Sequence, residues 1–312
     1  MVYVLAVVAA LIVAGGEVVQ QRLAAQAPPQ DNLSPKLLLW LVRRPRWLAG
    51  VGCSFAGDLA FSGAVGSGSV IRVEAVFTVR LIFGLLIAAL WGQHRIPLRE
   101  TLAAAAITGG LVAFLFAARP HEGTSSLGVP DLRWGLGCGS VAIVALVLTL
   151  LARRFTHSPR ALLLGVAAGG LFGLQASLMK RSVQVFSHDG AVALLSTWSG
   201  YAVIAAALSG MLLMQSAFNT APLAASYPGA VSGQLICSIA IGIAVLGGTI
   251  SLGTVSLAVG GAALLVLLVG IVLLARSPIV TGAHHHRHGR ATTSDVAERE
   301  RARLGRRIER GQ

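Results

Sequence analysis

Long runs of apolar residues, separated by short polar segments, occupy most of the chain up to residue 276. A helix that crosses a membrane needs about 20 mainly apolar residues, and about nine runs meet this requirement. The runs are Val2–Val19, Trp47–Val65, Val70–Trp91, Thr101–Ala118, Trp134–Leu151, Ala161–Met179, Ala191–Ala217, Pro222–Leu246 and Thr254–Ala275. The pattern predicts an all-α, polytopic integral membrane protein with about nine transmembrane helices.

The composition points to the same class. Apolar residues make up 55% of the 312 positions and charged residues 12%, whereas a soluble domain carries about 25% charged residues. The mean hydropathy is +0.75. Cys53, Cys138 and Cys237 lie in separate apolar runs, so we expect neither a disulfide framework nor a metal site from them.

The positive charge is distributed as in a membrane protein. The formal net charge is +13, but the Lys and Arg residues lie in the segments between apolar runs and in the last part of the chain, which argues against a nucleic-acid partner. Ten of them fall on one side: Arg22, Lys36, Arg43, Arg44, Arg46, Arg95, Arg99, Arg153, Arg154 and Arg160. Four fall on the other: Arg119, Arg133, Lys180 and Arg181. The bias predicts a plasma (inner) membrane protein with its N-terminus outside and its C-terminus in the cytoplasm.

Both ends of the chain allow a second interpretation. Ala25-Gln26-Ala27 resembles a signal-peptide cleavage site, but no Lys or Arg precedes the first apolar run, so we favour a transmembrane helix. Residues 277–312 form a basic tail expected to lie near anionic lipid headgroups. The histidines within residues 284–288 of this tail fit a flexible polar linker, with a metal site as the alternative.

Two parts of the chain also resemble each other in sequence. Ser62-Gly63-Ala64 is echoed by Gln215-Ser216-Ala217, and the segment Glu17–Arg22 is echoed by Gln175–Lys180. The order of helices then repeats, with residues 1–119 as a first four-helix unit and residues 161–276 as a second. One linking helix, residues 134–151, separates the units and inverts the second, and such inverted repeats are typical of alternating-access carriers.

The two hairpin segments carry a family resemblance. The segments SGAVGSGSVIRVEAVFTVRLIFGLLIAALWG and QSAFNTAPLAASYPGAVSGQLICSIAIGIAVLGG resemble hairpins of the drug/metabolite transporter superfamily. The number of spans and the Gln-Gln-Arg ending of the first span are most similar to its NIPA-type, EamA-like branch. The resemblance implies a carrier with a central cavity between inverted halves. Where that family often has Glu at the end of the second hairpin helix, this chain has Gln93 and Gly248 nearby.

Polar residues inside apolar spans are the candidate functional residues, because a charge there costs about 2.5–3.5 kcal/mol. The proposed lining of the substrate or coupling site is Glu17, Asp58, Arg72, Glu74, Arg80, Gln175, Tyr227 and Gln234. The two arginines suit an anionic substrate group, with a structural ion pair to Asp58 as the alternative. Glu74 and Glu17 are the candidate coupling carboxylates, although Glu17 lies near the end of its span and simply reaching water is an alternative for it.

Two further sequence features concern the helices themselves. Tyr227-Pro228-Gly229 predicts a kinked or broken eighth helix beside the site. Gly165, Gly169 and Gly173 lie four residues apart, which predicts close helix packing.

The sequence therefore favours a secondary transporter of small solutes, without cofactor or metal. Nucleotide-binding, HExxH and nucleophile-elbow motifs do not occur, so we do not expect an enzyme. A NIPA-like magnesium transporter is one alternative. A non-transporting membrane scaffold that presents the basic tail is another.

Overall fold

The computed structural model describes residues 2–67, 76–92 and 128–247, with isolated positions between 102 and 113 and between 259 and 266. The described elements are helical throughout, as the sequence predicts. They are α1 (Val2–Ala24), the short 3-10 helix η1 (Pro29–Asp31), α2 (Pro35–Val42), α3 (Pro45–Ser67), α5 (Arg80–Gly92), α7 (Asp131–Ala152), α8 (His157–Ser196), α9 (Trp198–Thr220) and α10 (Leu223–Ala244).

Five of the described helices are long and apolar enough to cross a membrane: α1, α7, α8, α9 and α10. They identify a multi-pass membrane protein. Helix α3 is as long as α1. Helix α5 is a shorter apolar helix. The proposed nine-helix count also needs spans in residues 101–118 and 254–275, which lie largely outside the described part.

Local sequence explains where several helices begin. The Ser34 side chain accepts a hydrogen bond from the Lys36 backbone N–H at 3.3 Å, and Pro35 follows as the first residue of α2. Helix α3 starts at Pro45, and Pro130 and Pro222 precede α7 and α10. Proline is tolerated at these positions because the first N–H groups of a helix have no partner within it.

Helix α8 differs from the predicted sixth span, Ala161–Met179. It runs from His157 to a break at Gly190 (φ +82°, ψ −178°), a length of about 50 Å that exceeds the roughly 30 Å of hydrocarbon in a bilayer. The seventh span was predicted to start at Ala191, but α9 starts at Trp198, because the backbone of Thr197 is extended.

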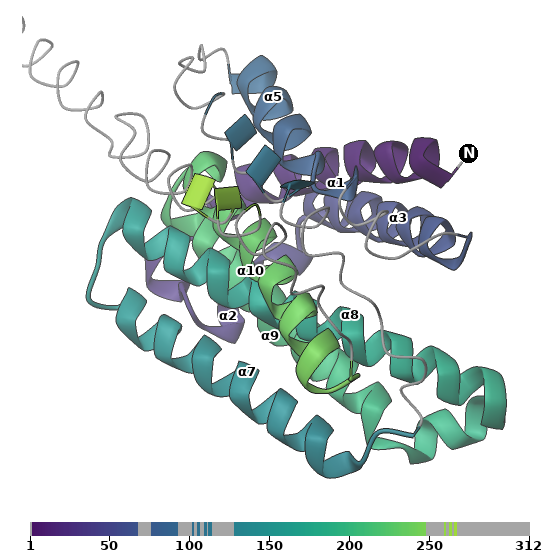
Figure 1. The fold of residues 1–312 in the computed structure, drawn as a ribbon. Helices are drawn as coiled ribbons and strands as arrows, with labels where there is room; N and C mark the ends of the chain where they lie inside the picture. The colour runs from purple at the N-terminus through teal and green to yellow at the C-terminus, as the bar shows by residue number, and fades with distance from the viewer. Residues whose placement is uncertain are drawn as a thin grey trace, which may run out of the picture.

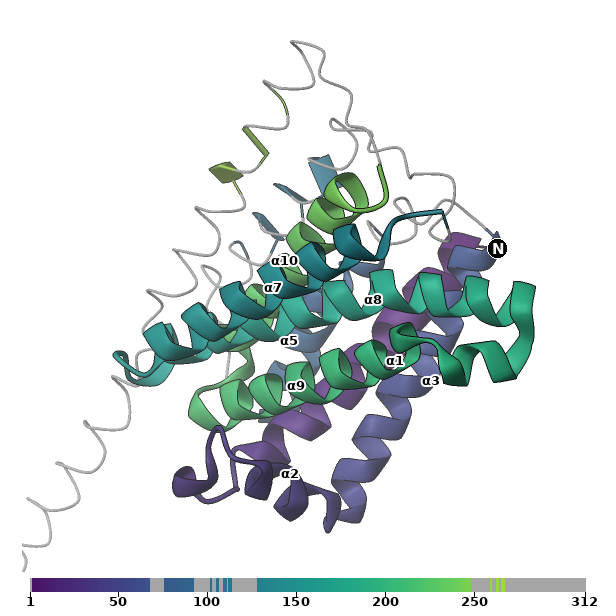
Figure 2. The ribbon, with the colours of Figure 1, turned by 90° about the horizontal axis from the view of Figure 1, so that it is seen from below.

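The helices form two groups that pack against each other. Helices α7, α8, α9 and α10 lie together, and α1, α3 and α5 lie together beside them (Figures 1 and 2). Contacts of α1 with α9 and of α5 with α10 join the groups. The main cluster of buried apolar residues draws on both groups, including Val18 and Leu81 from one and Leu164, Phe218 and Tyr227 from the other.

Glycines bring α8 and α10 into close contact. A Cβ added to Gly165, Gly169 or Gly173 would clash with a backbone carbonyl oxygen of α10. The predicted close packing through these glycines is therefore confirmed, since only hydrogen fits between the two backbones. Helix α10 continues as one helix through Pro228, so the proline does not break it, and the predicted kink stays a prediction.

Candidate functional site

Charged and polar side chains from four helices come together where the two groups of helices meet. They are Glu17 of α1, Asp58 of α3, Arg80 of α5, and Tyr227 and Gln234 of α10, and we call them the central cluster. All five were candidates from the sequence. Among the described residues, the cluster combines two carboxyl groups with one guanidinium group.

Arg80 is held in a defined position at the start of α5. Its side chain is only 8% exposed, and its Nη2 donates a hydrogen bond of 2.6 Å to Oε1 of Gln234. The guanidinium carbon lies 4.7 Å from the centre of the Phe77 ring. A cation in the first turn of a helix is unfavourable for the helix dipole, so the contacts with α10 and with the ring must offset that cost.

Tyr227 is completely buried and fits against α5 at a glycine. A Cβ added to Gly84 would lie 2.7 Å from the Tyr227 ring, so a larger residue at position 84 would displace the tyrosine. The Tyr227 hydroxyl lies beside the Glu17 carboxyl group. The fit at Gly84 therefore positions the hydroxyl next to the acid.

The Glu17 carboxyl group lies inside the protein. Its Oε2 atom and the Tyr227 hydroxyl are both buried, and neither makes a hydrogen bond of standard geometry with another described residue. The positive charge of Arg80 attracts the carboxylate, and the charge of Asp58 repels it. Helix α1 continues to Ala24, so Glu17 lies two turns before its end. Burial of Oε2 argues against the alternative that Glu17 simply reaches water.

Asp58 belongs to the rim of the cluster rather than to its interior. It is exposed on α3, yet it lies close enough to Arg80 for the two charges to interact. One hydrogen bond of Arg80 goes to Gln234. Gln175 is half-buried on α8, and no hydrogen bond or ion pair between described residues joins it to the cluster. Arg72 and Glu74 lie outside the described residues.

A second polar contact, not predicted from the sequence, joins the two groups of helices. The buried side chains of Gln20 and Gln215 form what we call the glutamine pair, in which Nε2 of Gln215 donates to Oε1 of Gln20 at 2.8 Å. Gln20 in turn donates to Oγ of Ser54 at 2.9 Å and to the Gly50 carbonyl at 3.3 Å. Trp47 Nε1 donates to Oε1 of Gln215 at 3.3 Å. The pair thus connects α1, α3 and α9.

A third set of contacts, which we call the loop clamp, fastens the loop after α1 to α8 and α9. Asn32 Nδ2 donates to the Ser216 carbonyl and to Oδ1 of Asn219, both at 2.9 Å. Arg160 Nη2 donates to Oδ1 of Asn32 at 2.8 Å. Asn219 Nδ2 donates back to the carbonyls of Ala24 and Ala27, both at 2.9 Å. The end of α1, the start of α8 and the end of α9 therefore meet at one end of the protein.

A different arrangement occupies the opposite end of α8 and α9. Arg181 Nη2 lies 2.9 Å from Oδ1 of Asp131, to which Trp198 Nε1 also donates at 3.2 Å. The Arg181 guanidinium lies 5.0 Å from the Trp198 ring and 5.6 Å from the Trp134 ring. These residues come from α7, α8 and α9 alone.

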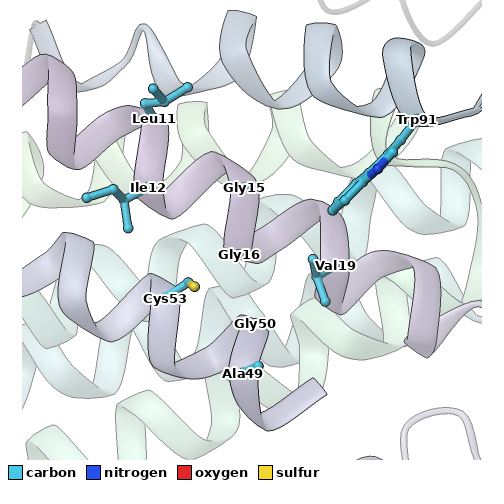
Figure 3. A pocket seen from close by; sticks show the side chains of 9 residues that line it. All are labelled: Leu11, Ile12, Gly15, Gly16, Val19, Ala49, Gly50, Cys53 and Trp91. Carbon is cyan, nitrogen blue, oxygen red and sulfur yellow. The ribbon is translucent and has the colours of Figure 1, made fainter. Parts of the chain in front are cut away.

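The central cluster has no set of ligands typical of a metal site. Among the described residues, no group of three or more His, Cys, Asp or Glu side chains is placed to hold a metal ion. An open pocket of about 350 Å³ lies between α1, α3 and Trp91 (Figure 3). Its lining is apolar, and none of the predicted site residues belongs to it.

Comparison with known proteins identifies a relative that covers most of the chain. The chain is similar to an uncharacterized protein of Corynebacterium glutamicum, Cgl0250/cg0304, with 30% identity over 274 residues that cover 87% of this chain and 93% of the corynebacterial protein. No protein-family model matches the chain, and no solved structure matches it. The name of the corynebacterial protein assigns it no activity.

Proposed function

The chain belongs to the same family as the Corynebacterium glutamicum protein Cgl0250/cg0304, and we propose that it is a secondary transporter of small solutes that works by alternating access. The observation that carries the proposal is the central cluster. Each charge inside a membrane costs about 2.5–3.5 kcal/mol and is usually retained for a function. Here Glu17, Arg80 and Tyr227 meet between apolar helices.

The chemistry of the cluster suggests a separate role in transport for each of its side chains. Arg80, held by Gln234 and Phe77, would bind an anionic or polar group of the solute, since a guanidinium group recognises carboxylates and phosphates well. Glu17 would bind the coupling proton or cation, because its Oε2 atom is buried between the helices and lies near Arg80 and Tyr227. The Tyr227 hydroxyl beside Glu17 would then contact both the solute and the coupling proton or cation.

The pairing of helices supports two repeats of inverted topology. In the proposed scheme α1 corresponds to α8, α3 to α9 and α5 to α10. Helix α1 packs against α3 and α5, and α8 packs against α9 and α10, so corresponding helices have corresponding neighbours. A drug/metabolite transporter-like architecture has this property, and repeat interfaces near the bilayer midplane are where carriers bind substrate.

The distribution of polar contacts supports alternating access. The glutamine pair and the loop clamp join the two groups of helices, and the loop clamp lies at the basic end that we assign to the cytoplasm. In this scheme the described conformation is closed on the cytoplasmic side. Opening toward the cytoplasm would require the contacts of Asn32 and Gln215 with the other group to break.

The experiment is a solute screen with purified protein in proteoliposomes. Uptake of radiolabelled carboxylates, amino acids, sugars, amines and Mg²⁺ is compared between wild type, Arg80→Ala and the matched control Arg153→Ala, which changes an exposed arginine. We expect one solute class to accumulate, and folded Arg80→Ala to lose that uptake while Arg153→Ala keeps it. Wild-type uptake by folded Arg80→Ala would contradict the site assignment.

The same screen separates the alternatives. Movement of Mg²⁺ alone would favour the magnesium transporter. If no solute moves, and truncation after Pro278 alone abolishes the phenotype of the gene in cells, the scaffold replaces the carrier.

A further inference from the structure

An apolar groove runs along α1 on the outer surface of the first group of helices. It is the pocket of Figure 3, with a volume of about 350 Å³, and its lining residues are Leu11, Ile12, Gly15, Gly16, Val19, Ala49, Gly50, Cys53 and Trp91. Its floor is the close contact of α1 with α3, where a Cβ added to Gly16 would lie 2.5 Å from the Gly50 carbonyl. No atom lies within 4 Å of a Cβ added to Gly15, so no side chain fills the groove at this point.

The groove extends along most of the depth of one leaflet. Its lining on α1 runs from Leu11 to Val19, a rise of about 12 Å, and half of the hydrocarbon thickness is about 15 Å. Trp91 extends from α5 toward Val19 on α1 (Figure 3). Its ring therefore covers one end of the groove.

Two arginines lie at that same end. The Arg22 guanidinium carbon is 5.1 Å from the centre of the Trp91 ring, and Arg22 is one turn beyond Val19 on the same side of α1. Arg46 lies one turn before Ala49 and Gly50 on α3, again on the side of the groove, and it is exposed. The neighbouring sequence, residues 18–57, contains five Lys and Arg residues and one acidic residue, Asp31, so this part of the chain is strongly cationic.

We propose that the groove is a binding site for an anionic glycerophospholipid. One acyl chain lies along Leu11, Gly15 and Trp91, and the phosphate group is bound by Arg22 and Arg46. Guanidinium groups bind phosphate in a bidentate manner, and the apolar lining excludes polar ligands from the rest of the groove. This proposal does not depend on the transport function.

The two arginines set the expected selectivity. A basic side chain near an anionic membrane surface contributes about 1 kcal/mol, which is roughly a fivefold preference for each arginine over a zwitterionic lipid. Removing both should therefore abolish most of the preference, and removing exposed arginines elsewhere should not.

The test uses quenching of Trp91 fluorescence by lipids with brominated acyl chains. Full-length protein is reconstituted in phosphatidylcholine that contains a small fraction of brominated phosphatidylglycerol or brominated phosphatidylcholine. The contribution of Trp91 is the difference between each protein and its Trp91→Phe form. We compare wild type with Arg22→Gln/Arg46→Gln and with Arg153→Gln/Arg154→Gln, which removes two exposed arginines beyond α7. Circular dichroism checks that each variant is folded.

We expect brominated phosphatidylglycerol to quench Trp91 severalfold more effectively than brominated phosphatidylcholine in wild type and in Arg153→Gln/Arg154→Gln. The preference should disappear in Arg22→Gln/Arg46→Gln. Equal quenching by both lipids in wild type, or a preference that survives this double change, would overturn the proposal. An equal loss of the preference in Arg22→Gln/Arg46→Gln and in Arg153→Gln/Arg154→Gln would also overturn it. Absence of Trp91 quenching by either lipid would mean that protein covers the groove, and would also overturn it.

Discussion

Replacing Gln215 by alanine should measurably weaken the contact between the two groups of helices. The change leaves two buried groups without their partners, the Gln20 Oε1 atom and the Trp47 Nε1–H group. Hydrogen bonds between membrane helices average about 0.6 kcal/mol and reach about 1.7 kcal/mol. Two such bonds give an expected loss of about 1–3 kcal/mol in the free energy of unfolding, and the lost packing of the side chain adds to it.

The matched control is Gln175→Ala, a change of the same kind at a half-buried position where no described hydrogen bond is lost. It should cost less than about 0.5 kcal/mol. Both variants are unfolded reversibly in mixed micelles. A double-mutant cycle that combines Gln215→Ala with Gln20→Ala then isolates the contribution of the contact between the two glutamines. We expect a coupling energy of about 0.6–1.7 kcal/mol between positions 20 and 215. A coupling near zero, with Gln215→Ala as stable as Gln175→Ala, would refute the reasoning.

Three further changes test other parts of the fold. Gly169→Val should separate α8 from α10 and lower the free energy of unfolding by about 1–3 kcal/mol. The control is Gly170→Val, which should have a much smaller effect because a Cβ at Gly170 has open space. Equal melting temperatures of the two variants would contradict this packing. Gly190→Ala should cost about 1–3 kcal/mol, because its φ of +82° combined with an extended ψ is a glycine conformation; an unchanged melting temperature would show that the break is not required. Asn32→Ala should speed amide hydrogen exchange in residues 25–34 relative to the control Gln30→Ala at an exposed position, and identical exchange would contradict the loop clamp.

The sequence predicted the features that depend on local composition. Long apolar runs located α1, α7, α9 and α10 to within several residues, because a span is defined by the hydropathy of one continuous segment. The glycines at Gly165, Gly169 and Gly173 were predicted to pack closely, since small residues four apart lie on one face of a helix. Glu17 and Arg80 were recognised because charges are rare inside apolar segments.

Features that depend on distant partners were missed. Gln20 and Gln215 are 195 residues apart, and each appeared in the sequence only as part of a repeated segment. Asn32 lies in a loop, where an asparagine is usually a turn residue, so its contacts with Asn219 and Arg160 could not be expected. The break at Gly190 was also missed, because the sequence does not show which of its many glycines adopts a positive φ angle.

Gradient-driven uptake by a Glu17→Gln variant tests the central claim most directly. The change keeps the size of the buried side chain and removes the carboxylate that we assign to coupling. In proteoliposomes, with the solute found by the screen, uptake by folded Glu17→Gln should fall to the level of empty vesicles. The control Asp189→Asn, which alters an exposed acid, should transport like wild type. Uptake by Glu17→Gln at the wild-type rate would show that the buried carboxyl group is not the coupling site.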